Sequence, residues 1–265
     1  MAQVARPTAL VTGASGGIGA ELARLLAAGG YDLLLVARSE GRLRAFAEDL
    51  SRAHGIRAVV VAADLSRGEE VDRVARTATA EGAVDVLVND AGFGLHGPFA
   101  ATEWGREQEM ILVNVVALTR LSKAILPGMV ARRRGRILNV ASTAGFFPGP
   151  FMAVYYATKA YVLSLSLALA EEVRGTGVTV TCLAPGATRG TAFAEGAGMS
   201  GSRLFRSPTV MDAPAVARAA YGGLMAGRKL VIPGLANRVM VESGRLAPRG
   251  LLARIARTLQ DPSDM

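Results

Sequence analysis

The 265-residue sequence has little cysteine or histidine and no long uninterrupted apolar run. Its single cysteine, Cys182, excludes an intramolecular disulfide. No apolar run reaches the ~18 residues that a membrane-spanning helix needs, and residues 1–7 lack the apolar region of a secretory signal. With a hydrophobic fraction of 51%, these absences predict one large globular domain in the cytoplasm.

Lysine is also scarce, although the formal net charge is +8. Of the 30 Lys and Arg residues only Lys123, Lys159 and Lys229 are lysine. The arginines are scattered apart from a cluster over residues 132–136, and aromatic residues are few, which argues against a nucleic-acid-binding surface. Position 159 is therefore informative, because an arginine there would be larger, forked and differently hydrated.

Apolar runs alternate along the chain with segments of helical periodicity. Strands are predicted at 8–12, 32–37, 57–62, 84–88, 136–141, 178–183 and 229–232, and helices at 18–28, 41–54, 66–81, 102–126, 153–173 and 216–225. This alternation predicts an α/β fold with one doubly wound, mostly parallel, seven-stranded sheet and helices on both faces, over residues 1–233. A basic amphipathic helical tail over residues 234–265 is expected to pack on the same domain.

A glycine loop, Gly13-Ala-Ser15-Gly-Gly17-Ile18-Gly19, joins the first strand to the first helix. Strand, glycine loop and helix together present backbone N–H groups and a positive helix end to phosphate. The spacing differs from the commoner Gly-x-Gly-x-x-Gly fingerprint of dinucleotide sites. The loop also matches Gly-x-Ser-x-Gly of serine hydrolases, but His54 and His96 both lie too early in the chain for that catalytic triad.

The ends of the next strands supply further cofactor candidates. Arg38 follows the second strand, where a site for NAD usually carries an acid that binds the ribose 2′-hydroxyl. A guanidinium suits a 2′-phosphate, so the sequence favours NADP(H) over NAD(H); the alternative is an arginine that points into solvent. After the third strand, the Asp64 carboxylate can accept a hydrogen bond from an adenine amino group. The small residues of Asn89-Asp90-Ala91-Gly92 let a cofactor lie across the fourth strand.

A serine, a tyrosine and a lysine converge in the second half of the chain. Ser142 ends the fifth strand, and Tyr155 and Lys159 are four positions apart on the following helix, so they share a face. A phenol has a pKa of about 10, and a nearby ammonium group is expected to lower it. Ser142 can hold a substrate oxygen against the phenol, which makes a general acid/base for a carbonyl/alcohol pair. Alone, Tyr-x-x-x-Lys also fits an ordinary helix with a packed tyrosine and an exposed lysine.

Asn114 lies between Val113 and Val115 in the long helix predicted over residues 102–126. A buried amide is costly unless it is hydrogen-bonded. Two interpretations stay open: the local backbone satisfies the amide, or a helix irregularity there holds a water molecule on a proton path to Lys159.

Together these residues resemble the short-chain dehydrogenase/reductase family, from about Thr8 to Ile232. The resemblance implies a Rossmann-type fold in which Tyr155 is the proton donor and acceptor, Lys159 binds the nicotinamide ribose and acidifies Tyr155, Ser142 orients the carbonyl, and Asn114 completes a water relay. It implies that the cofactor is bound by Gly13, Ser15, Gly17, Ile18, Gly19, Arg38, Asp64, Leu65, Asn89, Ala91, Gly92, Tyr155, Lys159, Pro185, Gly186 and Thr188.

The sequence departs from the family pattern at two places. The family often has Asn-Asn-Ala-Gly where this chain has Asn89-Asp90-Ala91-Gly92, which places a charge beside the cofactor loop. Gly190 shifts Thr191 out of its usual register and leaves its contact with a cofactor open. Tyr156 matches no family position and is expected to be a packing residue.

Most phenylalanines follow the predicted strand ends, where open α/β sheets bind ligands. Aromatic rings there suggest an apolar pocket. The candidate substrate residues are Ser142, Phe93, Phe147, Phe151 and Phe193; Phe99, Phe146 and Phe205 lie in the same loops. We therefore expect a hydrophobic ketone or secondary alcohol of acyl, steroid-like or aryl type. The alternative is that the rings pack the loops among themselves. A catalytically silent nucleotide-binding regulatory or scaffold protein is the competing class of function.

Two helical segments bear on association. The helix at 153–173 is apolar on almost all sides between Val162 and Ala170, and the family commonly pairs it and the 102–126 helix between subunits, so a homodimer or homotetramer is expected. In the tail, Leu251, Leu252, Ile255 and Leu259 share one face, with Arg254 and Arg257 opposite. Packing on the protein, including over the substrate pocket, is favoured over contact with a membrane surface.

Overall fold

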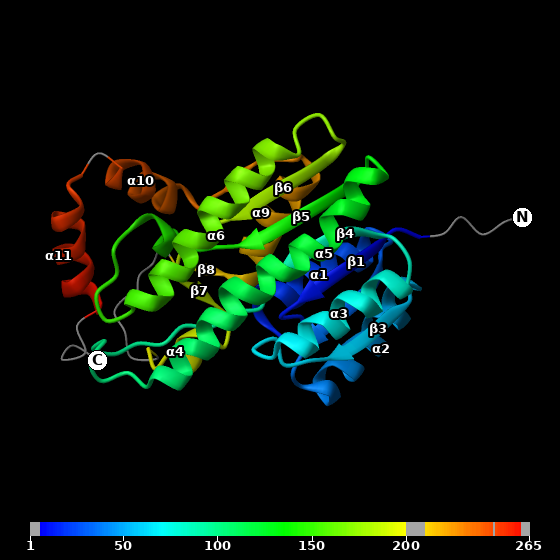
Figure 1. Ribbon diagram of the computed structural model, residues 1–265, viewed down its shortest axis with the longest axis horizontal. Coiled ribbons are helices and arrows are strands. Elements are labelled where there is room, and N and C mark those ends of the chain that lie inside the picture. The colour runs from blue at the N-terminus through cyan, green and yellow to red at the C-terminus, as the bar shows by residue number, and fades with distance from the viewer. Residues whose placement is uncertain (1–5, 200–209, 246, 261–265) are drawn as a thin grey trace, which may run out of the picture.

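A seven-stranded parallel sheet forms the centre of the computed structural model, which describes residues 6–199, 210–245 and 247–260 (Figure 1). The strands are β1 (Thr8–Thr12), β2 (Asp32–Ala37), β3 (Ala58–Ala62), β4 (Val84–Asn89), β5 (Gly135–Val140), β6 (Val178–Leu183) and β9 (Leu230–Val231). Their order is β3-β2-β1-β4-β5-β6-β9, so the connections reverse direction between β1 and β4. Ligands bind at such reversal points, outside the carboxyl ends of the strands.

Helices cover both faces of this sheet because its strands are apolar on both sides (Figure 1). The long ones are α1 (Gly17–Ala28), α2 (Glu40–His54), α3 (Gly68–Ala80), α4 (Trp104–Ile111), η1 (Leu112–Ala117, a π-helix), α5 (Leu118–Ala131), α6 (Ala153–Glu172) and α9 (Ala213–Met225). The short elements are η2 (Thr143–Phe146, a 3₁₀ helix), α7 (Phe193–Gly196) and the paired strands β7 (Thr188–Arg189) and β8 (Met211–Asp212).

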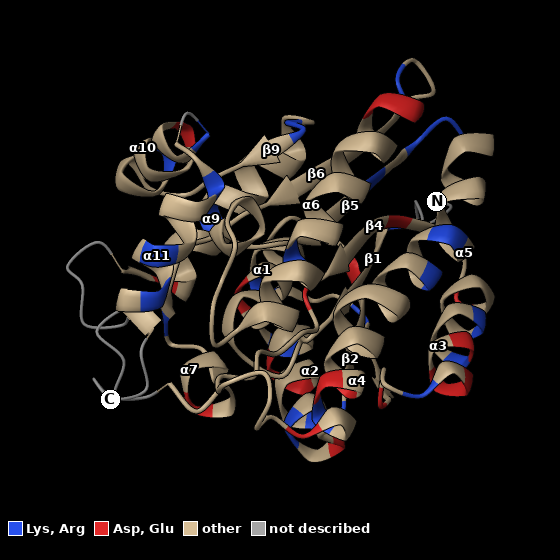
Figure 2. Ribbon diagram, turned by 60° about the vertical axis from the view of Figure 1, so that its left-hand side comes forward, with Lys and Arg blue, Asp and Glu red and all other residues tan. Residues whose placement is uncertain are grey.

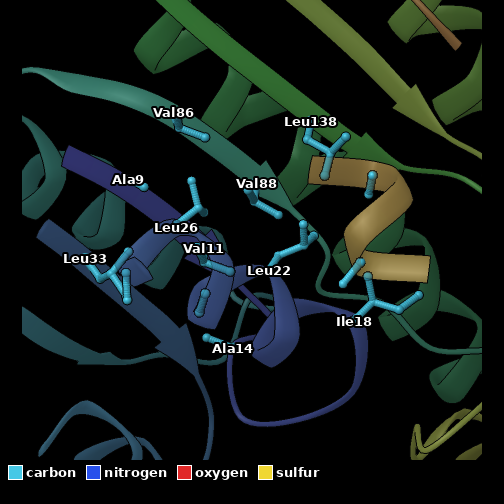
Figure 3. Close-up of a cluster of buried hydrophobic side chains, with 14 of the residues drawn as sticks. Ala9, Val11, Ala14, Ile18, Leu22, Leu26, Leu33, Val86, Val88 and Leu138 are labelled. Atoms are coloured by element: carbon cyan, nitrogen blue, oxygen red, sulfur yellow. The ribbon is translucent and has the colours of Figure 1, made fainter. Parts of the chain in front are cut away.

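The sheet separates two hydrophobic cores. Alternate strand residues such as Val11, Leu33 and Val88 pack with Leu22 and Leu26 of α1 on one face (Figure 3). The residues between them in the strands face the helices α3, α5 and α6 on the other side. Burial on both faces therefore fixes which way each side chain points and holds the strand ends in a common plane.

The α4–η1–α5 segment differs from its prediction at its carboxyl end. The helix was expected to stop near Pro127, but it continues to Ala131 with Pro127 inside it. The proline lacks an N–H group and costs one helical hydrogen bond. Ile125 and Met129, four residues apart on either side of it, are both buried in the second core. Their burial stabilises the turn beyond the proline.

The chain ends in two helices beyond the carboxyl ends of the strands, α10 (Leu235–Gly244) and α11 (Arg249–Gln260) (Figure 1). Thr8, near the start of the described chain, begins β1 at the opposite end of the sheet. Strand β9 is shorter than the predicted 229–232 segment, and it pairs only with Cys182 and Leu183. The tail therefore leaves the sheet at once and crosses the end where a ligand would enter.

Candidate active site

Tyr155 and Lys159 occupy the first two turns of α6, and both are buried. The Lys159 Nζ atom donates a 2.8 Å hydrogen bond to the carbonyl oxygen of Val140 at the end of β5. It also lies 5.8 Å from the centroid of the Tyr155 ring. An ammonium group and a phenol are thus held on one helix face at the carboxyl edge of the sheet.

Ser142 is brought to Tyr155 by the short η2 helix. Its Oγ caps that helix, accepting from the N–H of Ala144 at 3.1 Å, and the Ser142 and Tyr155 side chains are hydrogen-bonded. Gly145 permits this approach, because a Cβ atom on it would lie 2.7 Å from the backbone oxygen of Lys159. The serine, the phenol and the ammonium group therefore meet as the sequence predicts.

The electrostatics differ from the expectation. Burial raises the pKa of Tyr155, and the hydrogen bond between Tyr155 and Ser142 only partly opposes that rise. Burial also lowers the pKa of Lys159, to about 8. The charge of Lys159, whose Nζ atom lies 5.8 Å from the centroid of the Tyr155 ring, does not offset the effect of burial on the Tyr155 pKa. The predicted lowering of the Tyr155 pKa is therefore not found; desolvation outweighs it.

Asn114 lies in the π-helical turn η1, so the predicted helix irregularity is confirmed. Its Oδ1 accepts from the Phe93 N–H at 3.1 Å, and its Nδ2 donates to the Phe93 carbonyl at 3.0 Å and to Thr158 Oγ1 at 3.1 Å. A Cβ atom on Gly92 would lie 2.8 Å from Asn114 Oδ1 and 3.5 Å from Lys159 Nζ. Asn114, Gly92 and Lys159 are neighbours, and a water relay through them stays a prediction.

The glycine loop has the conformation that its sequence requires. Gly13 and Gly17 have φ values of 71° and 59°, in the left-handed region that favours glycine. Gly17 begins α1, Ser15 is exposed, and Ile18 is buried in the first core. The loop therefore presents backbone to solvent beside a helix N-terminus, and it fits the phosphates of a dinucleotide.

Arg38 and Asp64 lie at the ends of β2 and β3, on the same side of the glycine loop. Arg38 is exposed, and Leu65 is buried. Burial acts to raise the pKa of Asp64, but hydrogen bonds from the Ser66 N–H and hydroxyl, and the charges of Arg38 and Arg67, hold that pKa below its usual value. An exposed guanidinium beside an ionised carboxylate fits a phosphorylated ribose next to an adenine.

The sequence did not predict a buried polar chain under the site, in which Asn89, named above only as a cofactor-binding residue, takes part. Asn89 Nδ2 donates to Ser122 Oγ at 3.1 Å and to Asn139 Oδ1 at 2.9 Å, and Asn139 Nδ2 donates to Ser166 Oγ at 3.0 Å. Asn139 is fully buried, and the Oδ1 atom of Asn89 has no partner among the described residues. The position of Asn139 within the otherwise apolar end of β5 could have predicted this chain, because a buried amide needs hydrogen-bond partners.

The loop after β6 closes the other side of the site. The Pro185 carbonyl accepts from the Thr143 N–H at 2.9 Å and from Ser142 Oγ at 3.3 Å, and Gly186 packs against Asn237 of α10. Thr188 is buried and bonds the Gly186 carbonyl at 3.0 Å. Thr191 lies against the glycine loop, 3.2 Å from the position of a Cβ on Gly17. Thr188 and Thr191 therefore both border the cofactor region.

The candidate substrate residues divide into three places. Phe93 and Phe193 belong to the cluster around Tyr155, and the Phe193 ring lies 5.1 Å from the Tyr155 ring. Phe151, with a strained φ of 64°, lies at the rim with His96. Phe147 packs instead against Gly244 of α10, and Phe205 lies outside the described residues. Of these phenylalanines, Phe93 and Phe193 therefore join Tyr155 in one apolar cluster.

The end of α11 docks on α6. Gln260 is buried; its Nε2 donates to the hydroxyl of Tyr156, and its carbonyl oxygen lies 2.8 Å from His96 Nε2. The Arg257 guanidinium lies 5.9 Å from the Phe151 ring centroid. Tyr156 therefore does more than pack: it connects the tail to α6 one residue after Tyr155.

Comparisons with known proteins agree with this geometry. Residues 7–199 match the sequence model of a family described as short chain dehydrogenase. A very-long-chain 3-oxoacyl-CoA reductase from Pyrenophora tritici-repentis (strain Pt-1C-BFP) is 38% identical over 180 residues, which are 66% of this chain and 53% of that protein. The chain thus spans about half the length of the curated relatives of this kind that it matches.

Two solved structures are similar over almost the whole chain. A short-chain dehydrogenase from Sphingobium yanoikuyae in complex with NADPH is 36% identical, with a TM-score of 0.82 and coverage of 92% of this chain and 94% of that one. The bulky-bulky ketone specific alcohol dehydrogenase from Comamonas testosteroni is 31% identical, with a TM-score of 0.77 and coverage of 92% and 93%.

Proposed function

The chain belongs to the short-chain dehydrogenase family, and from that premise we propose that it is an NADP(H)-dependent reductase of a bulky, apolar ketone. The observation that carries the proposal is the hydrogen bond between Ser142 and Tyr155, whose ring centroid lies 5.1 Å from that of Phe193. It gives one polar point, suited to a carbonyl oxygen, in an otherwise apolar cluster that includes Met110, Met152 and Met199.

The four polar residues have separate roles in this proposal. Tyr155 gives its proton to the substrate oxygen, and Ser142 holds that oxygen in reach of the phenol. Lys159 binds the nicotinamide ribose, and Asn114 completes a water relay that returns a proton to Tyr155. NADPH, when bound, supplies the hydride.

The test of this function is a panel assay that follows NADPH absorbance. Bulky aryl, steroid-like and 3-oxoacyl ketones should be reduced with a higher kcat/KM than small polar sugars. A higher kcat/KM on the sugars would contradict the apolar substrate. Binding of NADPH without reduction of any carbonyl would favour a silent nucleotide-binding regulatory or scaffold protein.

The preference for NADP(H) is proposed from Arg38 and is supported by the NADPH complex of the Sphingobium relative. Charge-assisted hydrogen bonds contribute about 1.5–3 kcal/mol. Replacing Arg38 by Gln should therefore lower kcat/KM for NADPH by about 10- to 100-fold and leave NADH turnover nearly unchanged. An equal loss with both cofactors would show that Arg38 does not read the 2′-phosphate.

We further propose that the protein is a homo-oligomer that pairs through η1, α5 and α6. Val116, Tyr161 and Leu167 are exposed there, beside a shallow groove of about 520 Å³ lined also by Thr119, Arg120, Lys123 and Ala124. The segments Trp104–Ala131 and Ala153–Glu172 are apolar and long enough to cross a membrane by composition, but their inner faces pack in the second core. A monomer in analytical ultracentrifugation would contradict the pairing.

A further inference from the structure

The carboxyl group of Asp90 lies against the glycine loop, near Gly13 and Gly19. The backbone N–H groups of Asp90 and Ala91 both donate to Thr12 Oγ1 at 3.1 Å, and these two bonds fix the loop after β4. The Oδ2 atom lies 2.6 Å from the position of a Cβ on Gly19 and 3.0 Å from one on Gly13. The carboxylate accepts a hydrogen bond from the Gly19 N–H. Asp90 therefore fills the space between the two glycines.

The same carboxyl group acts on Lys159 across the loop. Gly92, two residues further on, lies against Lys159 Nζ, with 3.5 Å between that atom and a Cβ position on the glycine. Burial raises the pKa of Asp90 to about 7, although the charge of Lys159 lowers it. Burial lowers the pKa of Lys159 to about 8, although the Asp90 carboxylate and, more weakly, Cys182 raise it. Each group thus favours the charge on the other.

We propose that Asp90 is a positioning residue for the reaction: it ties the glycine loop to β4 and keeps Lys159 cationic beside Tyr155. The proposal rests on the proposed function, in which a charged Lys159 serves Tyr155. Asparagine, which the sequence analysis identified as common at this position in the family, accepts the same Gly19 hydrogen bond but carries no charge. The two parts of the role can therefore be separated by one isosteric substitution.

The first experiment does not depend on any substrate. Protein labelled with [ε-¹³C]lysine carries only three labelled side chains, Lys123, Lys159 and Lys229, and the Lys159 signal is assigned with Lys159→Arg. In Asp90→Asn the pH midpoint of Lys159 should fall by about one pH unit or more, because an opposite charge is lost from a buried site. An unchanged midpoint would overturn the proposal.

A matched control is available at the far end of α6. Lys229 Nζ lies 2.6 Å from Glu171 Oε2 in an exposed ion pair. Glu171→Gln should leave the Lys159 midpoint where it is and move only the Lys229 signal. A Lys159 midpoint that moves equally in Asp90→Asn and Glu171→Gln would reflect general charge and contradict the specific pairing.

The second experiment reads the chemistry. In Asp90→Asn the alkaline limb of the kcat profile should move to lower pH, since Lys159 then loses its proton earlier, while the KM for NADPH changes less than twofold. In Asp90→Ala the KM should also rise several-fold, because the Gly19 hydrogen bond is lost. A residue with only a structural role would leave the pH profile of Asp90→Asn unchanged.

The wild-type protein supplies a measurement that needs no folded variant. Its Lys159 signal should show a second inflection near pH 7, where Asp90 titrates. A single inflection would contradict the coupling. If no ketone is reduced but the lysine midpoint moves as expected, the proposed function fails and the pairing of Asp90 with Lys159 stands.

Discussion

Helices α6 and α11 meet beside the candidate active site, yet they are built in opposite ways. Helix α6 is apolar over much of its surface and turns its polar side chains inward: Tyr155, Thr158, Lys159 and Ser166 are all buried. Helix α11 is strongly amphipathic, yet it buries Gln260 and leaves Leu251, Ile255 and Leu259 about half exposed. Arginines also lie on α11 (Figure 2).

The difference lies in the hydrogen bonds of the buried groups. On α6, the Lys159 ammonium, the Thr158 hydroxyl and the Ser166 hydroxyl are each bonded to β5, to Asn114 or to the helix backbone. On α11, the Oε1 atom of Gln260 is buried without a partner among the described residues. An unpaired buried amide atom costs about 1–3 kcal/mol. We infer that α6 is a fixed part of the fold and that α11 is held weakly.

The largest effect is expected on α6 itself. Tyr155→Phe removes the proposed proton donor and keeps the ring that packs on Phe193. Turnover should fall by about 10²- to 10⁴-fold, the usual contribution of a general acid. The affinity for NADPH, measured by fluorescence titration, should stay within about twofold of wild type. If Tyr155→Phe kept its turnover, Tyr155 of α6 would not be the proton donor.

The polar chain beneath α6 gives the next largest effect. Asn139→Leu leaves Asn89 and Ser166 without their shared partner, and each unpaired buried group costs about 1–3 kcal/mol. The free energy of unfolding, measured by urea denaturation, should fall by that amount or more. A loss below about 0.5 kcal/mol would mean that this chain does not fix α6.

A smaller effect is expected where α11 docks. Gln260→Leu removes the stabilising hydrogen bond to Tyr156, and it also removes the destabilising unpaired Oε1 atom. The two effects on the free energy of unfolding should therefore nearly cancel. The free energy of unfolding should change by less than about 1 kcal/mol. A loss as large as that of Asn139→Leu would show that the two helices are equally fixed and would end the comparison.

The smallest effect is expected on the outer face of α11. Leu251→Ser with Ile255→Ser replaces half-exposed side chains, and such surface changes usually alter stability by less than about 0.5 kcal/mol. Leu252→Ser, on the more buried side of the same helix, is the matched variant and should cost more. Equal losses of unfolding free energy in both variants would mean that the side chains of Leu251 and Ile255 are covered in solution.

The sequence predicted best the parts of the fold that depend on local pattern. The bounds of β1, β2 and β6 agree with the predicted strands because each is an apolar run bounded by glycine, proline or charge. The meeting of Ser142, Tyr155 and Lys159 also follows from strand ends and helix period.

The rest depends on contacts between distant segments. Pro127 was misjudged because burial of Met129 outweighs the proline, and Asn139 was missed because its partners come from two other elements, β4 and α6. Which face of α11 packs on the protein could also not be predicted from the amphipathic pattern of that helix alone. Which face docks depends on Tyr156 and His96, which are 104 and 164 positions away from Gln260. The pKa of Tyr155 was mispredicted because the cost of burial depends on the whole fold.

The positions of Gln260 and Thr8 have a practical consequence for anyone who labels this protein. Gln260 is buried against α6, whereas Thr8 begins its strand at the far end of the sheet (Figure 1). A fluorescent label attached near Gln260 would lie beside the candidate active site. The same label attached near Thr8 would lie at the opposite end of the sheet, so labelling near Thr8 is the choice for kinetic work.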